Sequence, residues 1–153
     1  MKRFIALLSA SLCCIALRAQ CADNISRMTE SSAISYGQAC YFAAVNAGIL
    51  SGDATYRQAF DTLTVHGCVP KGHILIEEIT LEQFAFICAK VWKISGGIFY
   101  RLFENPRYAL RELKAAGIVP ANSDPQKKLN GREALDIISA GMERCQKQGK
   151  AWQ

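Results

Sequence analysis

Apolar residues recur along this chain at the spacing of one face of an α-helix. Phe84, Ile87, Cys88 and Val91 fall at positions i, i+3, i+4 and i+7, and the stretch 135–142 repeats the pattern. Together with the start and stop signals described below, this spacing predicts five helices, near 35–47, 55–66, 80–94, 106–116 and 130–147.

Three of these helices share a start signal. An apolar residue precedes Ser, Thr or Asn, and Gln or Glu follows three residues later. The first polar side chain can accept a hydrogen bond from a backbone N–H of the first turn, and the second can reach back to the cap. The pairs are Ser35 with Gln38, Thr80 with Gln83, and Asn130 with Glu133.

Three helices also share a stop signal, which is a glycine followed by an apolar residue. Glycine tolerates the left-handed conformation that ends a helix, and the apolar residue folds back onto the last turn. The glycines are Gly48, Gly67 and Gly117, and the nearby Pro70 and Pro120 forbid continuation of two of the helices.

Two long segments of the chain, 57–91 and 107–141, align without a gap at an offset of 50. The identical positions are Arg57, Ala59, Leu63, Gly67, Val69, Pro70 and Ile87, which recur as Arg107, Ala109, Leu113, Gly117, Val119, Pro120 and Ile137. We interpret them as two complete helix–loop–helix repeats, with 35–50 as a divergent third. The predicted fold class is all-α, a small single domain of about five helices in repeated units.

The beginning of the chain differs from the rest. Lys2 and Arg3 precede an apolar stretch of 14 residues, and small residues follow it. This order is typical of a secretory signal peptide, and the apolar stretch is too short to cross a membrane. We predict a signal peptide at 1–21, a helical repeat domain at 22–147 and a flexible tail at 148–153. The protein is expected to be exported to the periplasm or cell envelope, with no transmembrane span in the mature chain.

The processing site has two interpretations. Cleavage after Ala19 or after Cys21 fits the small residues there, whereas a bacterial lipoprotein would be acylated on Cys21. Both alternatives stay open.

The charge balance argues against nucleic acid as a partner. Three of the 18 basic residues and none of the 13 acidic ones lie in the predicted signal peptide, so 22–153 carries 15 basic and 13 acidic residues. Nucleic-acid binding usually requires a basic face or stripe, which this balance does not indicate.

Four cysteines remain in the repeat domain: Cys40, Cys68, Cys88 and Cys145. Each lies where the helical pattern places an apolar residue, which favours buried thiols that pack as small hydrophobic groups. An oxidising compartment also allows one or two disulfides among them.

No catalytic, cofactor or metal motif occurs in the sequence. His66 and His73 lack the paired-ligand spacing of a zinc site, and no nucleophile-elbow, phosphate-loop or dinucleotide-binding pattern is present. Glu77, Glu78 and Glu82 surround a helix start, where carboxylates offset the helix dipole. We therefore predict a protein that is not an enzyme and uses no cofactor and no metal.

The segment 95–106 is an aromatic insertion between the two repeats. One interpretation is that its aromatic side chains close the gap between the repeats, with Phe99 and Phe103 in the core. The other is a contact patch made of Tyr100, Arg101, Arg107 and Tyr108. This composition is favoured at interfaces, and the patch requires Arg101 or Tyr100 to be exposed.

The helix end from Ala43 to Asp53 and the helix start from Ile79 to Ala85 resemble the S-layer homology repeat, and 129–135 is similar. The resemblance implies helical repeats, often in threes, that attach exported proteins to cell-wall polysaccharide. Leu81 stands where that family has the arginine that contacts the glycan, and Arg132 is displaced by one position. The segment 96–108 also resembles spirochaete envelope proteins.

These observations lead to one main hypothesis and two rivals. The chain is expected to be a non-enzymatic cell-envelope module that binds cell-wall polysaccharide or another envelope protein. The first rival is a structural scaffold for protein–protein interaction without glycan binding. The second is a small exported hydrolase with no recognisable motif.

Overall fold

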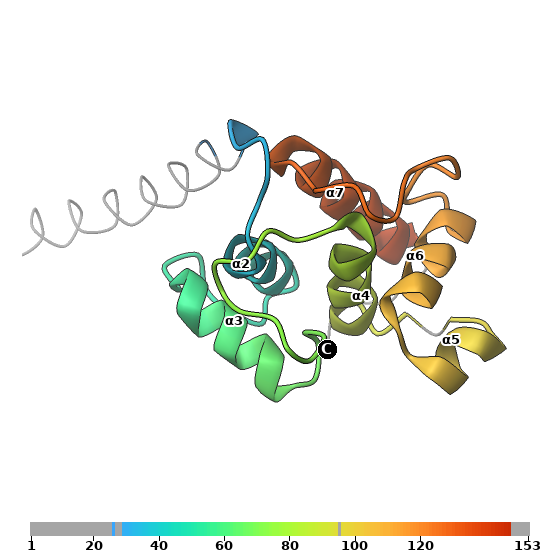
Figure 1. Ribbon diagram of the computed structural model, residues 1–153, viewed down its shortest axis with the longest axis horizontal. Helices are drawn as coiled ribbons and strands as arrows, with labels where there is room; N and C mark the ends of the chain where they lie inside the picture. The colour runs from blue at the N-terminus through green and yellow to red at the C-terminus, as the bar shows by residue number, and fades with distance from the viewer. Residues whose placement is uncertain (1–25, 27–28, 95, 148–153) are drawn as a thin grey trace, which may run out of the picture.

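The computed structural model describes residues 26, 29–94 and 96–147 and places six helices within 36–147 (Figure 1). Their bounds are α2 Tyr36–Asn46, α3 Tyr56–Val65, α4 Leu81–Val91, α5 Ile98–Phe103, α6 Pro106–Ala115 and α7 Gly131–Lys147. The described residues form no strand, which confirms the predicted all-α class of about five helices. The sequence pattern did not predict α5. The predicted signal peptide at 1–21 with Cys21, and the tail at 148–153, lie outside the described residues.

The helix starts form as the sequence predicts. At Ser35 the capping box is complete, since its hydroxyl accepts from the Gln38 N–H (3.3 Å) and its own N–H donates to Gln38 Oε1 (2.9 Å). Thr80 and Asn130 each share a hydrogen bond with the residue three positions on. A further capping box opens α3 at Thr55, a helix start that the sequence pattern had not singled out.

The predicted glycine stops are also present. Gly48, Gly67 and Gly117 have φ angles of 68°, 66° and 71°. The residue after each glycine donates its N–H to a carbonyl five positions back, as Cys68 does to Leu63 at 2.8 Å. This is the hydrogen-bond pattern of a Schellman motif, in which glycine is preferred at the left-handed position.

We expect Gly67→Ala and Gly117→Ala each to lower the free energy of unfolding by about 1 kcal/mol, because a Cβ is strained at these φ angles. No atom lies within 4 Å of either added Cβ, so the loss would be conformational and not steric. Denaturant unfolding of the two variants measures it. Unchanged midpoints in both would show that these glycines do not end helices in the way described.

Helix α4 ends in the same geometry without a glycine. Lys93 takes a φ of 46°, and the Ile94 N–H donates to the Ala89 carbonyl at 3.0 Å. The helix predicted over 80–94 therefore stops at Val91, because the chain turns left-handed at a residue type that carries no stop signal.

Three segments far apart in the sequence meet in a ring of hydrogen bonds, which we call the central ring. The Ile34 N–H donates to the Leu129 carbonyl (2.9 Å), the Leu129 N–H to the Ile79 carbonyl (3.1 Å), and the Ile79 N–H to the Ile34 carbonyl (3.0 Å). All three side chains are buried. Each residue immediately precedes a helix cap, so the ring joins the starts of α2, α4 and α7 in an approximately threefold arrangement.

Each of these helix starts also receives a loop from another unit. The Tyr36 N–H donates to the Glu77 carbonyl (2.9 Å), and the Leu81 N–H donates to the Lys127 carbonyl (3.0 Å). These bonds satisfy first-turn donors that have no partner within their own helix. The loops 71–79 and 121–129 occupy equivalent places, which confirms in three dimensions the repeat seen in the sequence.

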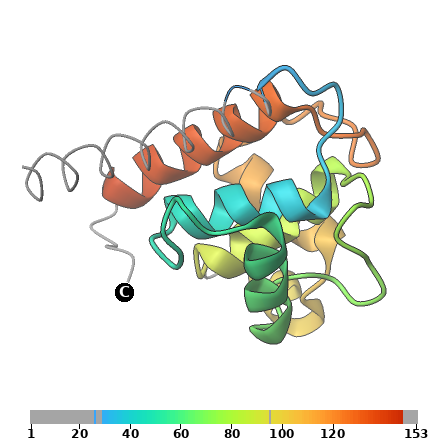
Figure 2. The same cartoon turned by 90° about the vertical axis from the view of Figure 1, so that its left-hand side faces the viewer.

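We number the units in chain order: the first contains α2, the second α3 and α4, and the third α6 and α7. The last helix of one unit packs on the first helix of the next, α2 on α3 and α4 on α6 (Figure 1). Helix α7, the last of the described helices, runs alongside α2 (Figure 2). Asp136 and Ser139 are exposed on α7 at the positions where α4 has the buried Phe86 and Ala89. Polar residues at these positions suit a helix face that meets water. None of the described helices is both long enough and apolar enough to span a bilayer.

Candidate functional site

A groove of about 450 Å³ lies between the first turns of α7 and the loop that follows α6, and we call it the α7 groove. Its apolar lining comes mainly from Leu81, Ile118, Val119, Leu129 and Ile137. Its polar lining consists of Asn122, Ser123, Asp124, Lys127, Glu133 and Asp136. Polar side chains are thus as numerous as apolar ones in this lining, so a ligand that fits the groove must itself carry hydrogen-bonding groups.

Glu133 is the central polar residue of the α7 groove. Its backbone N–H donates to the Asn130 cap (2.8 Å), and this contact fixes the start of α7 beneath it. One carboxylate oxygen, Oε1, pairs with the Lys127 ammonium. The other oxygen, Oε2, is buried and has no hydrogen-bond partner among the described residues. A carboxylate oxygen in this state can accept a hydrogen bond from a bound ligand.

Two further polar groups of the groove are available to a ligand. Asp136 lies one turn after Glu133 on α7, and Asn122 lies on the loop. Both side chains are exposed, and neither makes a hydrogen bond or ion pair with another described residue. The groove therefore offers hydrogen-bond acceptors on α7, an ammonium group at Lys127, and an amide on the opposite wall.

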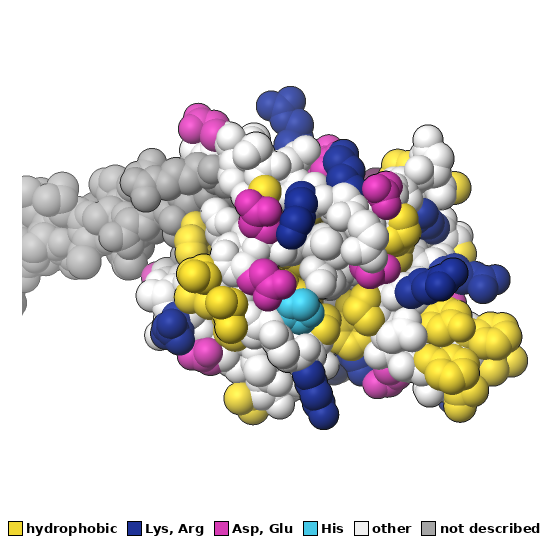
Figure 3. Space-filling model, in the orientation of Figure 1, with side chains coloured by type: hydrophobic (Ala, Val, Ile, Leu, Met, Phe, Trp, Pro, Cys, Tyr) yellow, Lys and Arg dark blue, Asp and Glu magenta, His cyan; other side chains and the backbone are white. Residues whose placement is uncertain are grey.

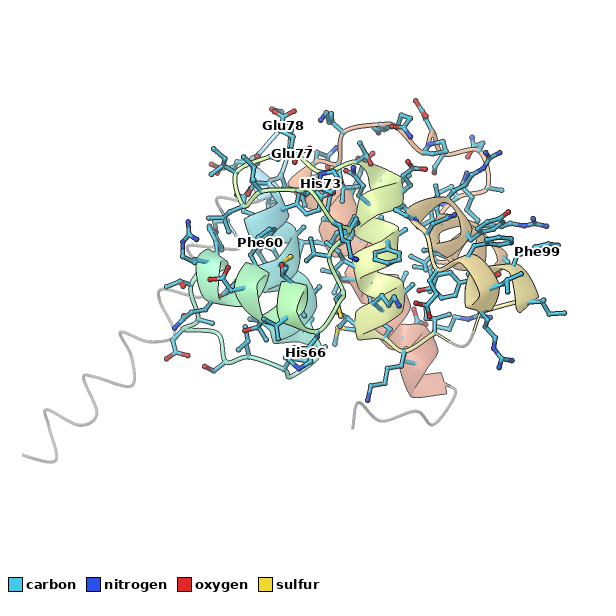
Figure 4. All side chains as sticks on the ribbon, turned by 60° about the horizontal axis from the view of Figure 1, so that its bottom comes forward. Phe60, His66, His73, Glu77, Glu78 and Phe99 are labelled. Carbon is cyan, nitrogen blue, oxygen red and sulfur yellow. The ribbon has the colours of Figure 1, made fainter. Side chains whose placement is uncertain are left out.

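The equivalent place in the preceding unit is closed by aromatic side chains. Tyr36 occupies the position of Leu81, and its ring stacks on His73 with centroids 4.7 Å apart and planes 21° apart. Phe60 meets Tyr36 edge-on at 6.4 Å. Tyr36 is fully buried, and Figure 4 shows His73 beside Glu77 in this region.

Glu77 holds His73 against Tyr36. The His73 Nδ1 and the Glu77 Oε2 are 2.9 Å apart, and this hydrogen bond lowers the pKa of Glu77. Burial raises the pKa of Tyr36, so that its hydroxyl stays protonated over the whole physiological range. The aromatic stack is thus a packing feature of the second unit.

The α7 groove is open because the residues that line it include none of these aromatic side chains. Leu81 replaces Tyr36, Ser123 replaces His73, and Asp136 replaces Phe86. Smaller or polar side chains leave a volume that a stacked pair fills elsewhere. The sequence analysis did not predict this site. The alignment of the two repeats contained a sign of it, since Ser123 and Asp136 are small or polar where the other repeat has His73 and Phe86.

The residues of the predicted contact patch differ in their exposure to solvent. Arg101 and Arg107 are exposed, and Arg101 fulfils the expectation of exposure. Tyr100 is only 5 % exposed, so the expectation that it offers a contact surface is wrong. Its ring points inward and lies close to Gly96, where a Cβ would meet it at 2.6 Å. Burial raises the pKa of Tyr100 to about 12.

The expectation that Phe99 and Phe103 belong to the core is also wrong. Both are more than half exposed, and each stacks on the ring of the partly buried Tyr108, at centroid distances of 6.0 Å and 5.6 Å. The reason is the short helix α5, which turns Tyr100 inward and leaves the neighbouring positions outside.

Cys40, Cys68 and Cys88 are buried, and Cys145 is partly buried. All four are thiols in the structure, and burial raises the pKa of Cys40 to about 12 and raises those of Cys68 and Cys88. High thiol pKa values suppress the reactive thiolate. The structure thus supports small hydrophobic packing groups at the three buried positions.

The two histidines have structural partners. The His66 ring nitrogen Nδ1 lies 2.8 Å from the Thr62 carbonyl at the end of α3, and His73 belongs to the stack described above. Within the described part of the chain, no group of three or more His, Cys, Asp or Glu side chains is arranged to hold a metal ion.

The fold and the groove define a small all-α protein of three related units, with an open polar groove in the last. Comparison with known proteins finds no family, no curated protein and no solved structure that matches the chain. The S-layer homology resemblance therefore rests on the sequence motifs alone.

Proposed function

We propose that this protein is an exported, non-enzymatic module of the cell envelope that binds cell-wall polysaccharide in the α7 groove. The observation that carries the proposal is the difference between equivalent places in two units. One is closed by the Tyr36–His73 stack, and the other is open and lined by hydrogen-bonding groups.

The chemistry of the groove suits a polyhydroxylated ligand. Glu133 Oε2 and Asp136 can accept hydrogen bonds from sugar hydroxyls, and Asn122 and Lys127 can donate to sugar oxygens. The apolar wall around Leu81 and Ile137 can cover the C–H face of a sugar ring. A ligand hydroxyl that pairs with the buried Glu133 Oε2 also gives specificity, since a ligand without it leaves that oxygen unpaired.

Sedimentation with purified bacterial cell-wall sacculi, with and without their attached polysaccharide, tests the proposal. The informative variant carries Leu81→Tyr and Ser123→His together, which rebuilds in the groove the stacked pair of the preceding unit. We expect it to lose sacculus binding at least about tenfold, because the stack occupies the ligand volume. Its thermal stability should stay close to that of the unmodified chain.

Single variants test the groove even if the double variant does not fold correctly. Asp136→Ala should weaken binding, whereas Asp61→Ala, an exposed carboxylate on α3 outside the groove, should leave it unchanged. Equal binding by the unmodified chain and the Leu81→Tyr/Ser123→His variant would overturn the proposal. Binding to envelope proteins alone would favour the scaffold hypothesis, and release of soluble sugar from sacculi would favour the hydrolase.

A further inference from the structure

Helix α5 exposes four large apolar side chains within six residues. Ile98 is 81 % exposed, Phe99 56 %, Leu102 70 % and Phe103 54 %, and we call this set the α5 tip. Figure 3 shows hydrophobic side chains gathered at the edge of the molecule where α5 lies. Isolated exposed apolar residues are ordinary, but a contiguous apolar patch marks an interaction surface.

The α5 tip is convex, and one neighbouring helix supports it (Figure 3). Among the described helices, α5 packs closely only on α6. The side chain of Tyr100 is buried, and the ring of Tyr108 on α6 stacks with both Phe99 and Phe103. Figure 4 shows Phe99 directed away from the body of the molecule. The tip therefore projects from the molecule and does not form the wall of a groove.

Unpaired basic residues flank this tip. Arg101 lies within it, and Arg107 and Arg111 lie one turn apart on the supporting helix α6. All three are exposed, and none of their side chains makes an ion pair or hydrogen bond with another described residue. The acidic Glu104 at the end of α5 is paired with Lys90 at 2.5 Å. The carboxylate of Glu112 also lies at the start of α5, close to Gly97. Three arginines against this one carboxylate leave a positive charge beside the apolar side chains, and Figure 3 shows Lys or Arg side chains beside them.

We propose that the α5 tip inserts into the interfacial region of an anionic lipid bilayer. Its apolar side chains would enter the boundary between headgroups and acyl chains, and Arg101, Arg107 and Arg111 would bind lipid phosphates. The mode is peripheral, because α5 has only six residues and cannot span a bilayer. This proposal is independent of glycan binding in the α7 groove.

Size and shape favour a bilayer over a protein partner or a second copy of the chain. A fully buried aromatic side chain contributes about 150–250 Å². The tip has two of these, Phe99 and Phe103, and all four of its side chains are already partly covered. The tip thus offers an area on the order of a few hundred Å², well below the roughly 800 Å² per partner of a stable protein interface. A bilayer needs no complementary groove, whereas a protein partner for a convex knob does.

The test uses the full chain with vesicles of phosphatidylcholine containing about one third phosphatidylglycerol, and with vesicles of phosphatidylcholine alone. We expect binding to the anionic vesicles to fall at least about tenfold in the Phe99→Ser/Phe103→Ser variant, because apolar burial is lost. High salt should weaken binding as well, since it screens the arginine–phosphate attraction. The matched control is Ile74→Ser/Ile76→Ser, which removes two exposed apolar side chains from a loop of the second unit and should leave binding unchanged.

A local probe separates the α5 tip from any other membrane contact of the full chain. Tryptophan placed at 102 (Leu102→Trp) should be quenched by brominated lipid, and tryptophan at 65 (Val65→Trp), on the exposed face of α3, should not. Vesicle binding without quenching at 102, or unchanged binding of the double serine variant, would overturn the proposal. Loss of self-association or of a protein partner in that variant, with vesicle binding intact, would also overturn it.

Discussion

Ile79→Ala, a truncation at the central ring, is expected to lower the free energy of unfolding by about 3–4 kcal/mol. Ile79 is fully buried, and its backbone both donates to Ile34 and accepts from Leu129. Removing its side chain leaves a cavity where three units meet, and the hydrogen-bonded backbone of the ring restricts collapse into that space. Chemical denaturation followed by circular dichroism measures the loss.

Ile76→Ala is the matched control, because it makes the same change three residues away at a side chain that is 77 % exposed. We expect it to change stability by less than about 0.5 kcal/mol. If the two variants unfold at the same denaturant concentration, the central ring is not the packing centre of the fold.

Gly141→Ala is expected to lower the free energy of unfolding by about 2 kcal/mol or more, although alanine is the better helix former by about 1 kcal/mol. A Cβ at this position in α7 would overlap the six-membered ring of Trp92. Trp92 is only 4 % exposed, so its indole has little room to move away. The steric cost therefore outweighs the gain in helix propensity.

Two comparisons isolate this clash. Ser139→Ala, at an exposed position of the same helix, should be neutral or slightly stabilising. In a double-mutant cycle, Gly141→Ala should cost much less when Trp92 is already leucine, because the smaller side chain leaves room for the methyl group. An undiminished cost in the Trp92→Leu background would show that the indole is not the cause.

The two proposed surfaces lie at opposite ends of one helix. The loop after the C-terminal end of α6 forms one wall of the α7 groove, and Tyr108 near the N-terminal end of α6 supports the α5 tip. The ten residues of α6 correspond to about 15 Å of helix. Variants of one surface therefore leave the other intact, and glycan binding and lipid binding can be measured independently on the same protein.

The sequence by itself determined the local structure. The cap at Ser35 and the stops at Gly67 and Gly117 depend on hydrogen bonds and φ angles within a few residues, so their residue types are visible without the fold. The offset of 50 between the two long segments likewise predicted equivalent units, because equivalent packing positions need similar side chains. Where the local signal was absent, as at Lys93, the predicted helix end was wrong by a few residues.

Only the tertiary structure decided which side chains face water and where a ligand can bind. Tyr100 is buried and Phe99 exposed because α5 is set against α6, and the aromatic composition of the segment is the same in either orientation. The central ring and the contact between Gly141 and Trp92 join residues far apart in the sequence. The α7 groove likewise exists because side chains from separate segments leave a volume unfilled, and that volume depends on how the units pack together.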